Sequence, residues 1–161
     1  MTRTPPEANT RGAQLLRSPE FLEFAQAAGG FGVYDLDLLT GDISGTPLYF
    51  DLIGLAHGNQ SLSRDEWVAT IHPEDLEAMV VELGAAIDGA SPYQSEYRCL
   101  LPSGEVRWLS SRGQVLNGAS GHPVRVVGTL SDVSARKLLE EKLRYATESL
   151  NIAQTAAGLA T

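Results

Sequence analysis

Three histidines and one cysteine are the side chains of this sequence best suited to metal or nucleophilic chemistry. Imidazole is the commonest metal ligand in proteins, and a thiolate is a strong nucleophile. His57, His72 and His122 are too far apart for the short ligand spacing of a structural zinc site. Because His72 directly precedes Pro73 at a predicted helix start, we expect it to cap that helix. We expect His57 and His122 to be exposed.

Cys99 lies in a run that alternates like a strand, so we expect it to be a small packed residue. Trp67 and Trp108 are also expected in the core. The sequence lacks the phosphate-binding loop G-x-x-x-x-G-K-[ST], the nucleophile-elbow motif G-x-S-x-G of serine hydrolases and the zinc-protease motif H-E-x-x-H. An enzyme of α+β fold would need paired catalytic groups in one cleft, and the sequence does not offer them. We therefore predict a non-enzymatic domain.

Composition limits the classes of partner. The 161 residues carry a net charge of −8, with 43% hydrophobic and 20% charged residues, as expected for one soluble globular domain. The acidic balance argues against binding nucleic acid or an anionic membrane surface. No apolar run reaches the roughly 20 residues of a spanning helix, and the first residues are polar. We therefore expect a cytoplasmic protein.

Helix and strand signals alternate over the first half. Ser18 precedes Pro19, which places a capping hydroxyl before a proline at the first helical position. The predicted helices are Pro19–Ala28, Pro47–Ile53, Arg64–Ile71 and Pro73–Ile87, and the predicted strands are Phe31–Leu38 and Ile43–Ser44. Residues 1–17 are expected to form a flexible tail.

Three strands are predicted in the second half, at Tyr93–Leu100, Val106–Leu116 and Val124–Asp132. Turn residues at 102–105 and 117–122 join them as hairpins. Together with the first two strands they predict a five-stranded antiparallel sheet in an α+β fold.

After Asp132 the pattern is helical. Leucine and alanine residues recur at alternating spacings of four and three, at Leu139, Leu143, Ala146, Leu150, Ala153 and Ala157. This is the spacing of a coiled-coil seam and predicts a dimer stalk. The alternative is an amphipathic helix docked on its own domain.

An internal repeat suggests that a second domain begins near the end of the chain. LEFAQAAGGF at 22–31 resembles LNIAQTAAGL at 150–159, with five identities in ten positions. The predicted organisation is a tail at 1–17, a globular domain at 18–132, a linker helix at 133–150 and a truncated second repeat at 151–161.

Three spaced motifs resemble those of PAS domains, the sensory-box family. Residues 97–108 (YRCLLPSGEVRW) are similar to the family's Y-R-…-D-G-…-R-W segment, and residues 128–137 (GTLSDVSARK) to its closing PAC-type G-…-D-I-T-x-R-K. The run at 72–75 (HPED) resembles the family's H-P-x-D helix start. Ser103 in place of Asp is a mild departure, as is Val133-Ser134 in place of Ile-Thr. The resemblance spans about residues 19–138.

This resemblance implies a sheet that cups a small cavity, with helices on one face, an N-terminal cap helix and a C-terminal linker helix. PAS domains sense ligands, redox state or light, or only dimerise, and they pass the change to an output domain. The implied parent is a bacterial-type signalling protein, a sensor histidine kinase before a diguanylate cyclase (GGDEF protein). A ligand-free module for dimerisation or protein interaction is the alternative.

The cofactor stays open, with none as one option. Flavin photosensors of this family share an N-C-R-F-L helix motif whose thiol adds to the flavin ring, and no such run exists here. No specific motif supports flavin or haem, and no metal site is predicted. The expected partners are a second copy of the chain through its N-terminal and C-terminal helices, an effector domain in the same chain and a small-molecule ligand.

Two sets of site residues follow. Apolar positions expected to face the cavity are Leu52, Ile53, Trp67, Ile71, Val80, Tyr97, Leu109, Val115 and Val126. The signal relay is expected at Asp132, Val133, Ser134 and Arg136, where a carboxylate can cap the exit helix and pair with the arginine. A plain helix cap without a switching role is the alternative for Asp132. Glu96, Arg98, Arg107 and Arg112 are expected to form cross-strand ion pairs on exposed sheet faces.

Overall fold

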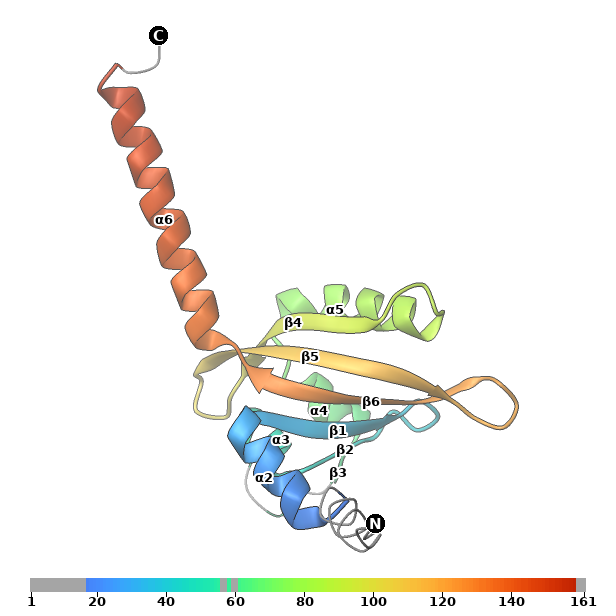
Figure 1. The fold of residues 1–161 in the computed structure, drawn as a ribbon. Helices are drawn as coiled ribbons and strands as arrows, with labels where there is room; N and C mark the ends of the chain where they lie inside the picture. Colours follow the sequence, from blue (N-terminus) through green and yellow to red (C-terminus); the bar gives the residue numbers. More distant parts are fainter. Residues whose placement is uncertain (1–16, 56–57, 59–60, 159–161) are drawn as a thin grey trace, which may run out of the picture.

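The computed structural model describes residues 17–55, 58 and 61–158 (Figure 1). Its helices are α2 (Pro19–Gly29), α3 (Pro47–Leu52), α4 (Arg64–Val68), α5 (Pro73–Ile87) and α6 (Ser134–Ala156). Its strands are β1 (Phe31–Asp37), β2 (Ile43–Gly45), β3 (Ser61–Leu62), β4 (Tyr93–Leu100), β5 (Val106–Asn117) and β6 (Pro123–Asp132). The predicted tail lies outside the described residues except for Arg17, and so do His57 and residues 159–161.

Within the described residues, the strands form one antiparallel sheet in the order β3-β2-β1-β6-β5-β4. The α+β class is therefore confirmed, but the sheet has six strands and not five. The strand that the sequence did not predict, β3, is only two residues long and pairs with β2 through Ile43 and Leu62. Two residues are too few to show an alternating pattern in the sequence.

The core lies between the sheet and the helices that pack on it. Helix α3 packs on β1 and β6, and α5 packs on β4 and β5. The inward residues of the strands are buried, and Cys99, Leu109 and Val126 are fully inaccessible to solvent. Along β4 the burial alternates strictly from Tyr93 to Cys99, as a strand with one covered face requires. The sheet can therefore present a defined set of side chains to the space under the helices.

Local capping explains where the helices begin. The Ser18 hydroxyl accepts a hydrogen bond from the Phe21 N–H at the start of α2. Ser63 and Glu66 form a reciprocal capping box at the start of α4. The Nδ1 atom of His72 accepts a hydrogen bond from the Glu74 N–H, 3.2 Å away, which confirms the predicted capping role.

Helix α4 is shorter than predicted, because the chain leaves it to pair with the sheet. The helix was expected to reach Ile71 but ends at Val68. Ile71 forms an isolated β-bridge with Cys99, and the Thr70 carbonyl accepts a hydrogen bond from the Leu100 N–H at 2.7 Å. These contacts with β4 are non-local, so helical spacing in the sequence could not reveal them.

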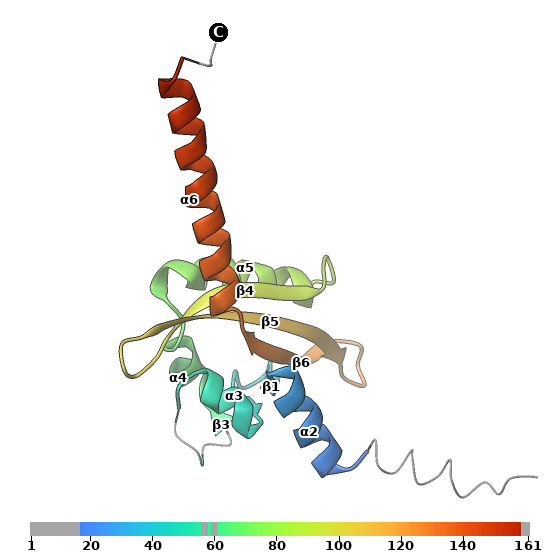
Figure 2. The same ribbon diagram turned by 60° about the vertical axis from the view of Figure 1, so that its left-hand side comes forward.

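Helix α6 projects away from the domain (Figures 1 and 2). It contacts β5 where it begins, and none of its described side chains is buried. The helix runs unbroken past Leu150 to Ala156, and the predicted boundary of a second domain stays a prediction. Among the described residues, no helix has the length and apolarity needed to cross a membrane.

Candidate functional site

A cavity of about 520 Å³ lies between the sheet and helices α3, α4 and α5. Its walls are mostly apolar, with aromatic and hydroxyl groups from the strands and charged groups near the β1–β2 turn. The lining comprises Tyr34, Leu36, Asp37, Leu38, Leu39, Thr40, Gly41, Ile43, Tyr49, Arg64, Asp65, Trp67, Val68, Thr70, Ile71, Leu76, Met79, Val80, Leu83, Tyr93, Tyr97, Ser111, Val126 and Leu130. The volume falls within the roughly 300–1,000 Å³ of small-molecule sites.

Two glycines make room for two tyrosines at the floor of this cavity. Tyr34 pairs with Gly128, Gly128 with Gly113, and Gly113 with Tyr93, so the four form one row across β1, β6, β5 and β4. A Cβ atom at Gly113 would lie 2.9 Å from the Tyr34 hydroxyl and 3.0 Å from the Tyr93 ring. Both phenol rings therefore depend on the missing side chains between them.

Four hydroxyl groups gather over this floor. The hydroxyls of Tyr34 and Ser111 lie 2.9 Å apart, and either can be the donor. Ser111 and Ser95 also act on Tyr93, where their hydrogen bonds partly oppose the rise in pKa that burial causes. Burial raises the pKa of Tyr34 to about 12. These phenols therefore stay neutral over the physiological range and can both donate and accept hydrogen bonds.

The structure brings five of the nine predicted lining residues to the cavity: Trp67, Ile71, Val80, Tyr97 and Val126. The other four are packed away from it. Leu52, Ile53 and Leu109 are buried in the core, and Val115 packs against that core half-buried. For Leu109 the inward parity was right, but it pairs with Asp132 at the end of β6, next to the exit helix, and does not line the cavity.

Sequence reasoning missed the tyrosines Tyr34, Tyr49 and Tyr93, and it missed Ser111. For Tyr93 the available signal was its alternation with polar residues on a predicted strand. Tyr49 lies on helix α3, and Tyr34 and Ser111 lie on strands whose inward parity the sequence left open. Gly113 and Gly128 could not reveal these tyrosines in the sequence, because the tyrosine rings that lie over them belong to other strands.

The two tryptophans have different surroundings. Trp67 is half-buried, packs against the core and lines the cavity, and its indole N–H donates to the Gly41 carbonyl at 2.8 Å. Trp108 was also expected in the core, but it points to the other face of the sheet. There, Lys137 Nζ lies 4.8 Å from its ring centroid and the Arg98 guanidinium carbon 5.6 Å. Trp108 therefore contacts the start of α6 and not the cavity.

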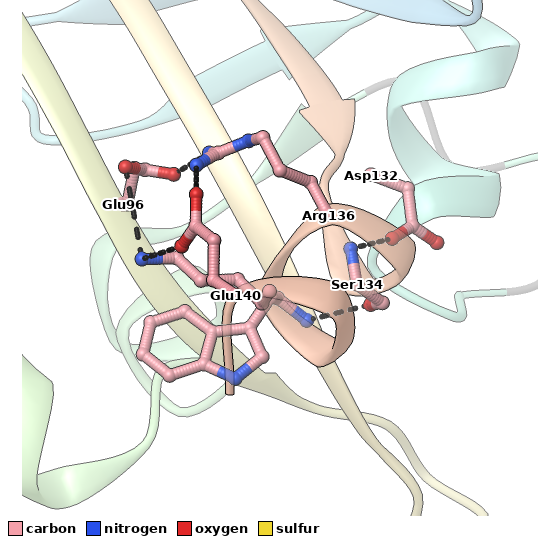
Figure 3. A network of polar contacts seen from close by, with 7 residues as sticks. Glu96, Asp132, Ser134, Arg136 and Glu140 are labelled. Atoms are coloured by element: carbon pink, nitrogen blue, oxygen red, sulfur yellow. Dashed lines mark hydrogen bonds and ion pairs between the residues drawn. The ribbon is translucent and has the colours of Figure 1, made fainter. Parts of the chain in front are cut away.

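The junction between β6 and α6 is held by backbone and side-chain hydrogen bonds (Figure 3). Asp132 Oδ1 accepts from the Ser134 N–H at 2.8 Å, so its carboxylate binds the first N–H of α6 from one position before the N-cap, which is Val133. The Ser134 hydroxyl accepts from the Trp108 N–H at 3.0 Å, and the Val133 N–H donates to the Trp108 carbonyl at 2.9 Å. The first turn of α6 is thus fixed to β5.

Arg107 connects this junction to helix α3. Its Nη1 atom donates to the carbonyls of Asp51 and Leu52, at 3.1 and 2.7 Å, and its Nε lies 3.4 Å from Asp132 Oδ2. The expected cross-strand ion pair of Arg107 is therefore present, between β5 and β6, but its guanidinium is half-buried against α3 and not on an exposed sheet face. Arg107 thus bridges the end of the helix that carries Tyr49, a cavity residue, to the residue that caps α6.

Arg136 was expected to pair with Asp132, and this expectation is wrong. Arg136 forms ion pairs with Glu96 on β4 and with Glu140, and Lys137 lies 3.8 Å from Glu96 (Figure 3). Arg136 and Lys137 lie about one helical turn beyond Asp132, and their side chains point toward the edge strand β4 and not toward the end of β6. Arg98 likewise pairs with Asp75 and Glu74 at the start of α5 rather than across the sheet.

A chromophore that forms a bond with a thiol does not fit this cavity. Cys99, the only cysteine of the chain, is fully buried, as predicted, and is not among the residues that line the cavity. Burial also raises the pKa of its thiol to about 11, which keeps it protonated and unreactive.

Comparisons with known proteins agree with this architecture. A blue-light-activated histidine kinase of Brucella anthropi is 24% identical over 145 residues, 90% of this chain and 29% of that protein. A sensory box histidine kinase/response regulator structure from Burkholderia thailandensis has a TM-score of 0.71 and 30% identity, covering 81% of this chain and 97% of that one. The N-terminal domain of a Marinobacter aquaeolei diguanylate cyclase with PAS/PAC sensor shares the fold, with a TM-score of 0.59, 22% identity, and coverage of 66% and 98%.

The chain spans only a little over a quarter of the length of the curated relatives that it matches. A sequence profile described as the PAS fold matches residues 46–130, slightly more than half of the chain. The sheet, the helices over its inner face and the cavity between them are the arrangement that the resemblance implied. The chain belongs to the PAS fold family and is a PAS sensor domain related to those of histidine kinases.

Proposed function

We propose that this domain binds a small ligand in the cavity and relays the change through the β6–α6 junction to an effector in a longer signalling protein. A histidine kinase is the favoured effector and a diguanylate cyclase the second, because relatives with both descriptions share the fold. The domain itself acts by binding and not by catalysis.

The bridge made by Arg107 carries this proposal. Helix α3 supplies Tyr49 to the cavity wall, and its last carbonyls are held by the same guanidinium that contacts Asp132. A ligand that moves α3 changes the position of Arg107 and, with it, the cap of α6. Such a shift needs only a differential affinity of the ligand for two arrangements.

Helix α6 offers a surface for a second copy of the chain. Leu139, Leu143 and Leu150 of the predicted seam are 58–68% exposed, and Ala146 is exposed between them. A parallel pairing of two α6 helices would cover this seam. The dimer would convert a tilt at Asp132 into a change of angle or register along the stalk.

Substitutions on and off the seam test the stalk. Leu150→Glu on the seam should shift sedimentation of the protein from dimer to monomer, whereas Ile152→Glu, on another side of the same helix and 70% exposed, should not. A dimer that is equally affected by both changes, or by neither, removes the seam from the proposal.

Insertions test the relay in the full-length protein. Seven residues added after Lys142 restore the heptad register and should leave the output responsive, whereas two added residues should abolish the response. Equal outcomes would exclude a stalk that transmits through register. The alternative, a ligand-free dimerisation module, predicts that native mass spectrometry finds a dimer and no bound small molecule.

A further inference from the structure

We propose that the cavity selects an uncharged small molecule with an apolar body and one hydroxyl group directed at the hydroxyl cluster of Tyr34, Tyr93 and Ser111. This inference rests on the proposed function, since it names the class of ligand for the same cavity. It follows from the chemistry of three parts of the lining.

The apolar walls define the body of the ligand. Leucine, isoleucine, methionine and valine side chains from the sheet and α5 face the space, among them Leu36, Met79 and Val126. Tyr49 and Tyr97 add aromatic surface, and Trp67 stands in the wall near the β1–β2 turn. Apolar contact stabilises binding by about 25 cal/mol per Å² of apolar area removed from water. A flat hydrocarbon or aromatic body therefore suits these walls.

The charges around the cavity disfavour a charged ligand of either sign. Among the described residues that line it, Arg64 is the one cation, and this side chain is exposed at the start of α4. The acidic residues of the lining, Asp37 and Asp65, are not buried either. A carboxylate, phosphate or ammonium group in the apolar interior would therefore lose its hydration without gaining a buried partner.

The hydroxyl cluster favours a ligand with a hydroxyl group. The hydroxyls of Tyr34 and Ser111 lie 2.9 Å apart with either as donor, and each can both donate and accept. Burial keeps the phenols of Tyr34 and Tyr93 neutral. A ligand hydroxyl can accept from this cluster and donate to it without bringing a charge that must be desolvated.

Four related probes separate these requirements: 2-naphthol, naphthalene, 2-naphthoate and 2-naphthylmethylamine. All four share the naphthalene ring. 2-Naphthol adds a neutral hydroxyl and naphthalene has no polar group, whereas 2-naphthoate carries a negative charge and 2-naphthylmethylamine a positive charge. Isothermal titration calorimetry should show 2-naphthol binding at least about tenfold more tightly than 2-naphthoate or the amine. Tighter or equal binding of either charged probe would overturn the proposed ligand class.

Variants assign the selectivity to the cluster. Tyr34→Phe and, separately, Ser111→Ala should weaken 2-naphthol binding by about threefold to tenfold and leave naphthalene binding unchanged. Tyr145→Phe on exposed α6 is the matched control and should change neither. Equal losses for both probes would show a packing defect and overturn the role of the hydroxyls.

The outcomes also separate this inference from the proposed function. If none of the four probes binds, the cavity does not accept small molecules, and both proposals fail. If 2-naphthol binds selectively but does not change the output of the full-length protein, the ligand class stands and the proposed relay fails.

Discussion

Tyr34 and Tyr93 lie in one transverse row of the sheet, on β1 and β4, with only Gly128 and Gly113 between them. Each ring occupies space that a side chain on the intervening strands would fill. The polar floor of the cavity is therefore formed by four residues that are far apart in the sequence, and two of them contribute by lacking a side chain.

The glycine row predicts a contrast between two glycine-to-alanine changes. A Cβ at Gly128 would collide with the Arg112 carbonyl oxygen and lie 2.5 Å from the Tyr34 hydroxyl, so Gly128→Ala should lower the free energy of unfolding by about 1–3 kcal/mol. Gly84 lies inside α5 with nothing within 4 Å of an added Cβ, so Gly84→Ala should raise it by about 0.5–1 kcal/mol. Urea unfolding measures both values. Shifts of the same sign would contradict the crowding at the row.

Arg107 is predicted to stabilise the fold more than a surface arginine does. Arg107→Met removes two hydrogen bonds to α3 carbonyls and the contact with Asp132, and should lower the free energy of unfolding by about 1–3 kcal/mol. Arg125→Met removes one exposed pair with Asp35 and should change it by about 1 kcal/mol or less. Chemical denaturation of the two variants side by side provides the comparison. Equal losses would mean that the Arg107 bridge is dispensable.

The pair of Arg98 and Asp75 predicts an acid-dependent contribution to stability. Hydrogen bonding from Arg98 holds the pKa of Asp75 below its ordinary value of 3.8, because the folded state favours the carboxylate. The stabilisation is present above that ordinary value and is lost as the pH falls through the lower folded pKa. Asp75→Asn should therefore be less stable than the parent at neutral pH, and the gap should narrow below about pH 4. Glu141→Gln on exposed α6 is the control, and a gap that is constant with pH would refute the prediction.

Alkaline pH should unfold the domain through its buried phenols and thiol. Burial raises the pKa of Cys99 from 9.0 to about 11 and that of Tyr34 from 10.0 to about 12, and it also raises the pKa of Tyr97 well above its ordinary value. The folded state therefore holds protons that the unfolded chain releases, so stability falls as the pH rises above about 9. Tyrosinate absorbance and circular dichroism, followed together, should show the buried tyrosines ionising as the fold is lost. Full ionisation with the native spectrum retained would contradict this.

Short-range patterns in the sequence were enough to predict most of the elements. Helix α5 and strand β4 begin and end at the predicted residues, because proline, a capping group and strict alternation act within a few positions. The motifs at 72–75, 97–108 and 128–137 also gave the family. The capping by Asp132 could be predicted for the same reason, since the N–H that it binds is two residues away.

The composition of the site depended on contacts that no local spacing reveals. The Tyr34–Ser111 hydrogen bond joins residues 77 positions apart, and Arg107 reaches Leu52 across 55 positions. Arg136 pairs with Glu96 and not with nearby Asp132, because a helical turn rotates its side chain toward β4. The sequence by itself determined most of the elements, their order and the caps at Ser18 and His72. Only the packing of the sheet against its helices decided which side chains meet in the cavity and at the junction, because strand register and helix rotation are set by the whole core.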